Sequence, residues 1–160
     1  MPRVVPRCAF WRRLSKIAAS GMPALDQRPR LLLADDHPQT ATLLRRLLLS
    51  EFDVLELVTD GRELISAAER LLPDVIVSDV TMPGLDGISA ATQILRKNPE
   101  ARVVFVTVHG DPVLVERGLS TGALGYVLKA AAGEDLIPAV RAALRGERHV
   151  SRTLQLSDED

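Results

Sequence analysis

The chain has 160 residues, of which 46% are hydrophobic and 26% are charged. This length and composition are typical of one globular domain with a single core, and they exclude two domains of ordinary size. The formal net charge of −1 is unevenly distributed: residues 1–29 carry six basic and one acidic side chain, and the remainder carries 14 basic and 20 acidic ones.

The basic segment 1–29 precedes the first strand-like run. Arginines interrupt its apolar residues, so it has no secretory signal core, and the chain has no run of about 20 apolar residues that could span a membrane. We expect a disordered leader on a cytoplasmic protein. A nucleic-acid arm, a membrane-surface helix, a targeting peptide and a true start codon at Met22 are the alternatives. The single cysteine, Cys8, excludes an intramolecular disulfide and a cysteine zinc site.

Five short apolar runs follow, separated by amphipathic stretches of helix length. The runs are mostly continuous, as expected for parallel strands covered by helices on both faces. Each begins roughly 20 to 28 residues after the previous one, which leaves room for a crossover helix. The pattern predicts an α/β fold with a doubly wound, five-stranded parallel sheet. The predicted strands are Leu31–Ala34, Val54–Val58, Val75–Ser78, Val103–Val106 and Leu124–Leu128.

Capping signals mark the helices between these strands. Asp60 followed by Glu63 indicates a capping box, and Asp111 followed by Pro112 suits the N-cap and first turn of another helix. The last helix is predicted to end at Gly146. We therefore expect a folded domain over residues 30–148 and a short acidic tail over residues 149–160, too short for a further domain.

Polar residues stand at the carboxyl ends of four of the predicted strands. Asp35 and Asp36 follow the first, Asp79 the third, Thr107 the fourth and Lys129 the fifth. In an open parallel sheet ligands bind at this edge, so these side chains should converge. Three close carboxylates repel one another unless a cation neutralises them. Oxygen ligands with no histidine or cysteine expected nearby indicate Mg²⁺ or Mn²⁺, and the predicted reaction is phosphoryl transfer to the Asp79 carboxylate.

The motifs at these strand ends resemble the receiver domain of two-component response regulators. The resemblance covers about residues 30–148 and is carried by LLLADDH (31–37), DVTMPGLDG (79–87), VT (106–107) and GYVLK (125–129). The stretch from Gly122 to Arg148 is similar in particular to the NarL/FixJ-type branch. The family's sheet is flavodoxin-like, with strand order 2-1-3-4-5.

The resemblance implies roles for individual residues. Asp79 would be phosphorylated by a sensor histidine kinase, a phosphotransfer protein or a small phosphodonor, and the chain would catalyse only its own phosphorylation and dephosphorylation. Asp36, Asp79 and the backbone carbonyl of Thr81 would bind Mg²⁺, with Asp35 helping directly or through water. A switch pair follows from the same resemblance. It consists of Thr107 and Tyr126, which would reposition the fourth helix and fifth strand for a downstream protein.

Three positions depart from the family pattern. Val108 follows Thr107 where a smaller residue is common, which suggests a narrower path to the phosphoryl group. His109 lies near the same mouth, and Ala130 follows Lys129 where proline is frequent. No helix-turn-helix segment follows the domain, so we expect no direct DNA binding from this chain.

The same residues bear on several other functions. A haloacid-dehalogenase-type phosphatase needs a second aspartate two residues after its nucleophile, where this chain has Thr81. A nucleotide- or flavin-binding module lacks its glycine pattern after the first strand. A phosphorylation-independent interaction module and a truncated remnant of a DNA-binding transcription regulator stay open. So does a homodimer formed through the last helix, or through the fourth helix and fifth strand.

Overall fold

The structure, a computed structural model, describes residues 27–155. The predictions for most of the leader, including Met22 and Cys8, concern residues outside this range. Its last three residues are described, and they attach to the domain: the Arg28 guanidinium donates to the Leu49 and Ser50 carbonyls, and the Pro29 carbonyl accepts from the Asp53 amide. In the described part of the chain, no helix has the length and apolar character needed to cross a membrane.

Six parallel strands form one sheet in the order β2-β1-β3-β4-β5-β6. This confirms the predicted parallel sheet and the order of its first five strands. Asp79 and Thr107, which were expected just after their strands, are the last residues of β3 and β4. The strands are β1 (Arg30–Ala34), β2 (Asp53–Val58), β3 (Val75–Asp79), β4 (Val103–Thr107), β5 (Gly125–Leu128) and β6 (His149–Val150).

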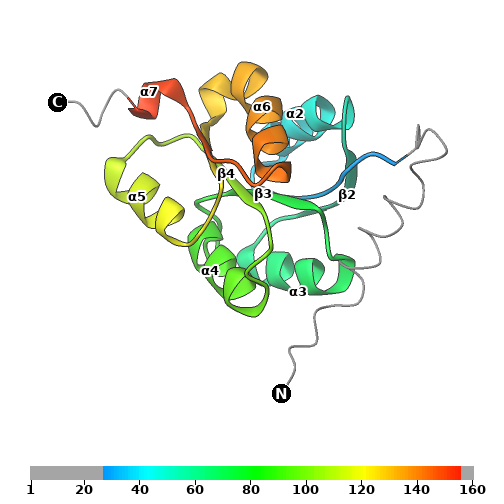
Figure 1. Cartoon of the computed structure of the whole chain (residues 1–160). Helices are drawn as coiled ribbons and strands as arrows, with labels where there is room; N and C mark the ends of the chain where they lie inside the picture. Colours follow the sequence, from blue (N-terminus) through cyan, green and yellow to red (C-terminus); the bar gives the residue numbers. More distant parts are fainter. Residues whose placement is uncertain (1–26, 156–160) are drawn as a thin grey trace.

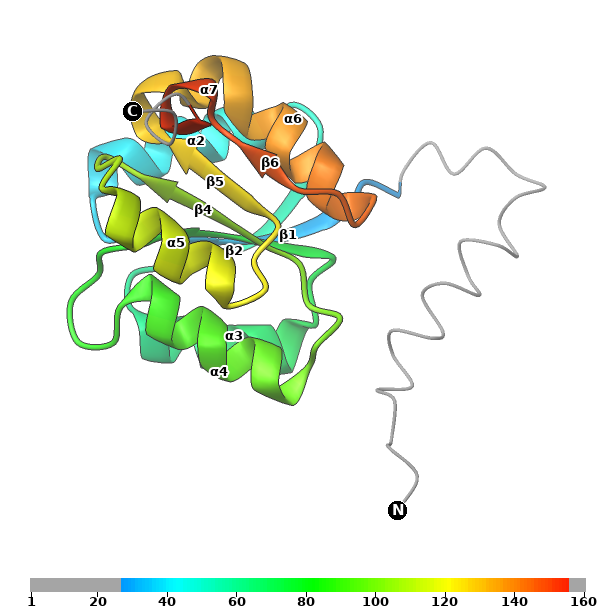
Figure 2. The same cartoon turned by 60° about the vertical axis from the view of Figure 1, so that its left-hand side comes forward.

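Helices cover both faces of the sheet. The helices α3, α4 and α5 lie on one face, and α2 and α6 lie on the other (Figures 1 and 2). The sheet is therefore doubly wound, as the pattern of the sequence predicts. The helices are α2 (Pro38–Leu49), α3 (Gly61–Leu71), α4 (Gly87–Lys97), α5 (Pro112–Ser120), α6 (Ala132–Leu144) and α7 (Arg152–Gln155), with a short 3-10 helix η2 (Lys129–Ala131) before α6.

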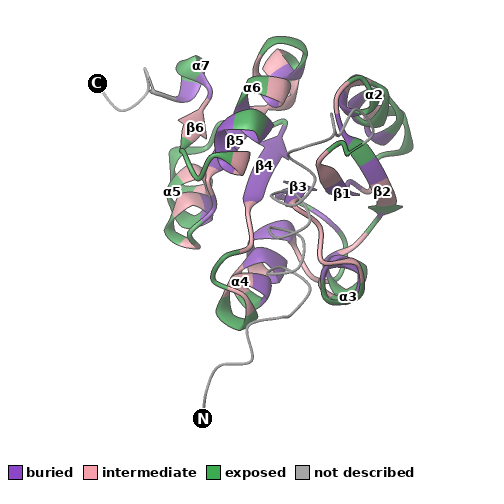
Figure 3. Ribbon diagram, turned by 45° about the vertical axis from the view of Figure 1, so that its right-hand side comes forward, coloured by how far each residue is buried: buried purple, intermediate pink, exposed green. Residues whose placement is uncertain are grey.

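Two apolar layers form the core, one on each face of the sheet. Successive strand residues point to opposite faces, so Leu32 packs with Leu64 under α3, whereas Leu31 and Leu33 pack with Leu136 under α6. Figure 3 shows β4 buried at the centre of the sheet. Because both faces are covered, the strands need apolar residues at every position, which explains their continuous apolar runs.

The predicted helix starts are formed with one difference in detail. The Asp60 carboxylate accepts from the Glu63 amide at 2.9 Å, but the Glu63 carboxylate accepts from the Thr59 amide, one residue earlier than in a standard capping box. Asp111 accepts from the Val113 amide at 2.9 Å and caps α5. Side-chain caps therefore fix the loops that lead from β2 and β4 into their helices.

The segment 149–155 corrects the predicted tail. Residues 149–150 form β6, which pairs with β5, and Leu154 of α7 is 6% exposed. Ser151 is buried; its hydroxyl donates to Asp135 at 2.8 Å and accepts from the Leu128 amide at 3.2 Å. A strand of two residues is too short to produce a periodic pattern in the sequence, so this part of the domain was missed.

Candidate functional site

The candidate site lies at the carboxyl edge of the sheet. Asp35 and Asp36 follow β1, Asp79 ends β3, and Lys129 follows β5. The strands are parallel and adjacent in the order β1, β3, β4, β5, so their ends meet at one edge. The structure thus brings together the carboxylates and the ammonium group that the sequence predicted to converge.

Lys129 bridges two of the carboxylates. Its Nζ lies 2.8 Å from Asp79 Oδ2 and 3.0 Å from Asp35 Oδ2. The side chains of Asp35, Asp79 and Lys129 are 0%, 4% and 7% exposed, whereas that of Asp36 is 26% exposed. Because burial keeps water from screening these charges, Asp35 and Lys129 interact strongly with the Asp79 carboxylate.

The backbone around Asp79 holds the carboxylate in place. The Thr81 amide donates to Asp79 Oδ1 at 3.2 Å, while Lys129 occupies Oδ2. Gly87, the first residue of α4, packs directly on Asp79: a Cβ atom there would lie 1.9 Å from the Asp79 carbonyl oxygen. Only glycine permits this approach, and it sets the distance between α4 and the end of β3.

The electrostatics of the edge perturb both partners of the central ion pair. Burial raises the pKa of Asp79 above its usual value, and the nearby Asp35 charge adds to this, although Lys129 and the Thr81 amide pull in the opposite direction. Burial alone would lower the pKa of Lys129, but its contacts with Asp79 and Asp35 outweigh burial and raise it. Lys129 is therefore a cation at neutral pH.

The acidic residues fit a divalent metal ion. Ligand atoms of Asp35, Asp36, His37 and Asp79 all lie within 4.8 Å of one another. Asp35 Oδ2 and Asp36 Oδ1 are buried and make no hydrogen bond of good geometry with described residues. Three carboxylates against one ammonium leave two negative charges uncompensated when all are ionised. Hard oxygen donors with that excess charge are what a small dication such as Mg²⁺ requires.

The expected switch residues lie behind this edge. Thr107 is fully buried at the end of β4, and its hydroxyl accepts from the His109 amide at 3.2 Å. Tyr126 of β5 is also fully buried, with its ring centroid 6.0 Å from that of Phe105. The Tyr126 hydroxyl is buried without a hydrogen-bond partner among the described residues. Burial, with the Asp111 and Asp79 charges, raises the pKa of Tyr126 to about 12.

Sequence reasoning missed one side chain at the edge, that of His37. Its Nδ1 lies 3.1 Å from Asp36 Oδ1, 3.5 Å from Asp35 Oδ1 and 3.8 Å from Asp79 Oδ2. Its position directly after the Asp35-Asp36 pair was the available signal. Two of the positions that depart from the family pattern lie at the surface. Val108 is 62% exposed, and Ala130 of η2 is also exposed.

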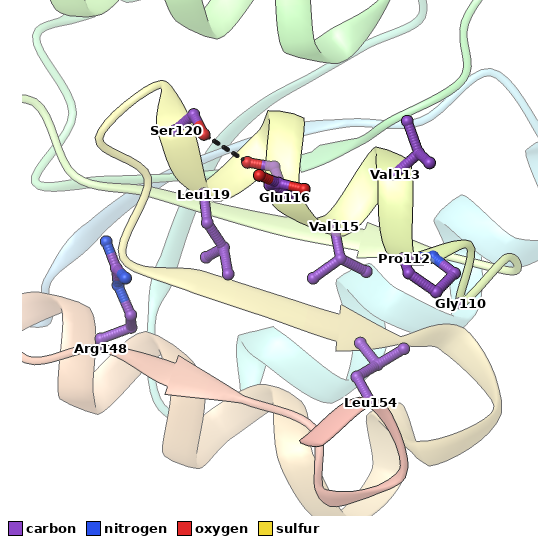
Figure 4. A pocket seen from close by; sticks show the side chains of 9 residues that line it. All are labelled: Gly110, Pro112, Val113, Val115, Glu116, Leu119, Ser120, Arg148 and Leu154. Atoms are coloured by element: carbon purple, nitrogen blue, oxygen red, sulfur yellow. Dashed lines mark hydrogen bonds between the residues drawn. The ribbon is translucent and has the colours of Figure 1, made fainter. Parts of the chain in front are cut away.

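A hollow of about 560 Å³ lies beside α5 (Figure 4), and none of the three site aspartates is among its lining residues. Val115 and Leu119 of α5 and Leu154 of α7 give it apolar walls, and Glu116 and Arg148 add one charge of each sign. Its apolar walls suit it to receive apolar side chains of another protein.

Comparison with known proteins links these features to one family. Residues 31–141 match the response regulator receiver domain. The response regulator GacA of Pseudomonas viridiflava is 37% identical over 125 residues, a stretch that covers 76% of this chain and 58% of GacA. The chain thus spans little more than half the length of this curated relative.

Solved structures agree with the match. A LuxR-family two-component response regulator from an Aurantimonas species superposes with a TM-score of 0.78 at 30% identity, covering 81% of this chain and 94% of that one. The signal receiver domain of NarL from Mycobacterium tuberculosis gives a TM-score of 0.71 at 29% identity, covering 76% of this chain and 99% of that domain.

Proposed function

The chain belongs to the response-regulator receiver family, as its motifs predicted, and from that premise we propose that it is a phosphorylation-controlled switch of a two-component system. Asp79 is the phosphoacceptor. The observation that carries this proposal is the contact of Lys129 Nζ with both Asp79 and Asp35 at the buried edge of the sheet. The donor is a sensor histidine kinase, a phosphotransfer protein or a small phosphodonor, and the reaction takes place in the cytoplasm.

In the proposed transfer, a carboxylate oxygen of Asp79 forms the new bond to phosphorus. The phosphorus–nitrogen bond of a phosphohistidine, or the phosphorus–oxygen bond of an acyl phosphate, breaks, and the leaving group keeps its electron pair. Lys129, already 2.8 Å from Asp79 Oδ2, pairs with the incoming phosphoryl oxygens. Because its pKa is raised, it carries its proton throughout.

Asp36, Asp79 and the backbone carbonyl of Thr81 would hold the divalent ion, with Asp35 contributing directly or through water. When bound, Mg²⁺ or Mn²⁺ would neutralise the excess carboxylate charge and the charge of the transferring group. The Oδ1 atom of Asp35 accepts from the His37 amide at 2.9 Å, which orients the carboxylate and leaves Oδ2 3.0 Å from Lys129 Nζ.

Thr107 and Tyr126 form the proposed switch. A phosphoryl group on Asp79 would draw the Thr107 hydroxyl toward it and vacate space for the Tyr126 ring. The buried Tyr126 hydroxyl has no hydrogen-bond partner among the described residues, which costs about 1 to 3 kcal/mol, and an outward rotamer in contact with water would relieve this cost. Phosphorylation would shift the population between these two packings.

The change would reach a downstream protein through α5 and β5. The ring of Tyr126 faces α5 at Gly118, where a Cβ atom would lie 3.0 Å from Tyr126 Cε2. Motion of the ring therefore alters how α5 sits on the sheet and changes the shape of the hollow beside α5 (Figure 4). We place the partner, either another protein or a second copy of the chain, at this surface.

Beryllofluoride, which imitates a phosphoryl group on aspartate, tests the site without a kinase. With millimolar Mg²⁺ it should raise the melting temperature by several degrees, because it binds only the folded state. The gain should vanish without Mg²⁺ and in Asp79→Asn. A shift that persists in Asp79→Asn would place the anion elsewhere and contradict the proposal.

A further inference from the structure

The imidazole of His37 points into the acidic cluster. Its Nδ1 lies 3.1 Å from Asp36 Oδ1, 3.5 Å from Asp35 Oδ1 and 3.8 Å from Asp79 Oδ2. We propose that His37 Nδ1 is an additional metal ligand and that the site binds first-row transition cations such as Ni²⁺ in preference to Mg²⁺. The inference rests on the proposed metal site and extends it to the choice of ion.

The three distances fit one coordination sphere. In an octahedron with metal–ligand bonds of about 2.1 Å, adjacent ligand atoms are about 3.0 Å apart and opposite ones about 4.2 Å. The separations of Nδ1 from the three carboxylate oxygens, 3.1 to 3.8 Å, fall within these limits. A cation could thus contact the imidazole and the carboxylates with small adjustments of the side chains.

Two further observations indicate that the cluster is arranged for a ligand. Asp36 Oδ1, the oxygen closest to the imidazole, and Asp35 Oδ2, on a residue 1% exposed, are buried without a hydrogen bond of good geometry among described residues. Asp35 Oδ2 has one charged neighbour, Lys129 Nζ at 3.0 Å, and burying a carboxylate oxygen with so few partners is costly. A metal ion would satisfy both oxygens.

The backbone fixes where the imidazole can go. The His37 amide donates to Asp35 Oδ1, and His37 is the N-cap residue of α2, followed directly by Pro38. The side chain itself is 62% exposed. The backbone position thus brings Nδ1 to the solvent-facing side of the cluster, where an ion can enter and keep water on its remaining positions.

The chemistry of the donors sets the preference. Carboxylate and carbonyl oxygens alone suit Mg²⁺, whereas an imidazole nitrogen suits Ni²⁺, Zn²⁺ and other first-row transition cations. A bound transition cation that takes His37 as a ligand leaves fewer positions for a phosphoryl oxygen. Such ions would therefore compete with Mg²⁺ and modulate phosphorylation of Asp79.

Calorimetric titration of the full chain with Ni²⁺ and, separately, with Mg²⁺ tests the inference at about pH 8, where free imidazole is neutral. Every sample carries Cys8→Ser so that no thiolate binds Ni²⁺. His37→Asn should weaken Ni²⁺ binding about tenfold to a hundredfold while changing the Mg²⁺ dissociation constant by less than about threefold. The asparagine amide can still donate a hydrogen bond, so a histidine that acts only as a donor would be replaced. His109→Asn, at an exposed histidine near the same mouth, is the matched control and should leave both affinities unchanged.

A spectroscopic readout separates ligation from an indirect effect. Electron-spin-echo spectra of bound Mn²⁺ should show coupling to a directly bonded nitrogen in the native chain and in His109→Asn, and lose it in His37→Asn. Unchanged Ni²⁺ affinity in His37→Asn, or equal losses for Ni²⁺ and Mg²⁺, would overturn the inference while Mg²⁺ binding still supports the proposed function. Failure of the native chain to bind Mg²⁺ at all would count against both.

Discussion

The apolar layers on the two faces of the sheet differ sharply from the charged edge at the carboxyl ends of its strands. In the layers, residues such as Leu64 and Leu136 are completely buried among other apolar side chains. At the edge, the side chains of Asp35, Asp79 and Lys129 are at most 7% exposed, but they are charged. Burial stabilises the first group by removing apolar surface from water, and it costs the second group its hydration.

The difference shows that the charged edge lowers the stability of the folded domain, whereas the apolar layers raise it. One ammonium cannot balance three carboxylates, so without a cation the edge opposes folding. The layers must supply enough stability to hold it together. The effect of a substitution on the free energy of unfolding should therefore depend on Mg²⁺ at the edge and not in the apolar layers.

The largest effect is expected for Lys129→Met. It leaves Asp35 and Asp79 buried without their shared partner, and removing one partner of a buried pair costs about 3 to 5 kcal/mol. Chemical denaturation in metal-free buffer measures the loss. Lys97→Met is the matched control, because the Lys97–Glu69 pair is exposed and should contribute less than about 1 kcal/mol. Equal losses would erase the contrast between edge and surface.

In the apolar layers, Leu136→Ala should lower the free energy of unfolding by about 2 to 5 kcal/mol, because it leaves a cavity under α6. The loss should be the same with and without Mg²⁺, since Leu136 is uncharged and packs among apolar side chains. Leu43→Ala, at a leucine 63% exposed, should change stability little. A Mg²⁺-dependent loss for Leu136→Ala would contradict the separation of the two regions.

Tyr126 belongs to both regions, since its ring packs in an apolar layer and its buried hydroxyl has no hydrogen-bond partner within residues 27–155. Its pKa is raised from 10.0 to about 12, so between these values the folded state keeps a proton that the unfolded state has lost. Stability should therefore fall by about 2 to 3 kcal/mol as pH rises through this window. It is the only tyrosine, so tyrosinate absorbance follows it directly, and Tyr126→Phe should remove the fall.

The smallest expected effect is a gain. Because burial raises the pKa of Asp79, stability falls as pH rises from the unfolded value of 3.8 through the folded value, and the cost persists at neutral pH. Asp79→Asn should remove this cost and stabilise the metal-free protein by about 1 kcal/mol, a difference that Mg²⁺ should shrink. Asp86→Asn, the same change at the N-cap of α4, should be neutral or destabilising. Destabilisation by Asp79→Asn in metal-free buffer would contradict the account.

Much of the fold followed from the sequence because the strands are buried on both faces. Continuous apolar runs at crossover spacing predicted five strands, and the polar residues after them predicted the convergence of Asp35, Asp79 and Lys129. The caps at Asp60 and Asp111 followed from local chemistry that needs no tertiary contact.

The rest depended on tertiary structure. The strand at residues 149–150 is defined by its pairing with β5 and leaves no pattern of its own. The approach of His37 Nδ1 to three carboxylates depends on the turn between β1 and α2, which no periodicity describes. The full burial of Tyr126, whose hydroxyl finds no partner in the described part of the chain, is likewise a property of packing, and the sequence indicated only its position on β5.

The central claim is that Asp79 accepts a phosphoryl group. Intact-protein mass after incubation with Mg²⁺ and acetyl phosphate or phosphoramidate tests it most directly, with Asp79→Ala as the matched variant. We expect the native chain to gain the mass of one phosphoryl group only when Mg²⁺ is present, and the variant to gain none. No gain from either donor in a folded sample would contradict the claim and favour a receiver-like module that binds its partner without phosphorylation.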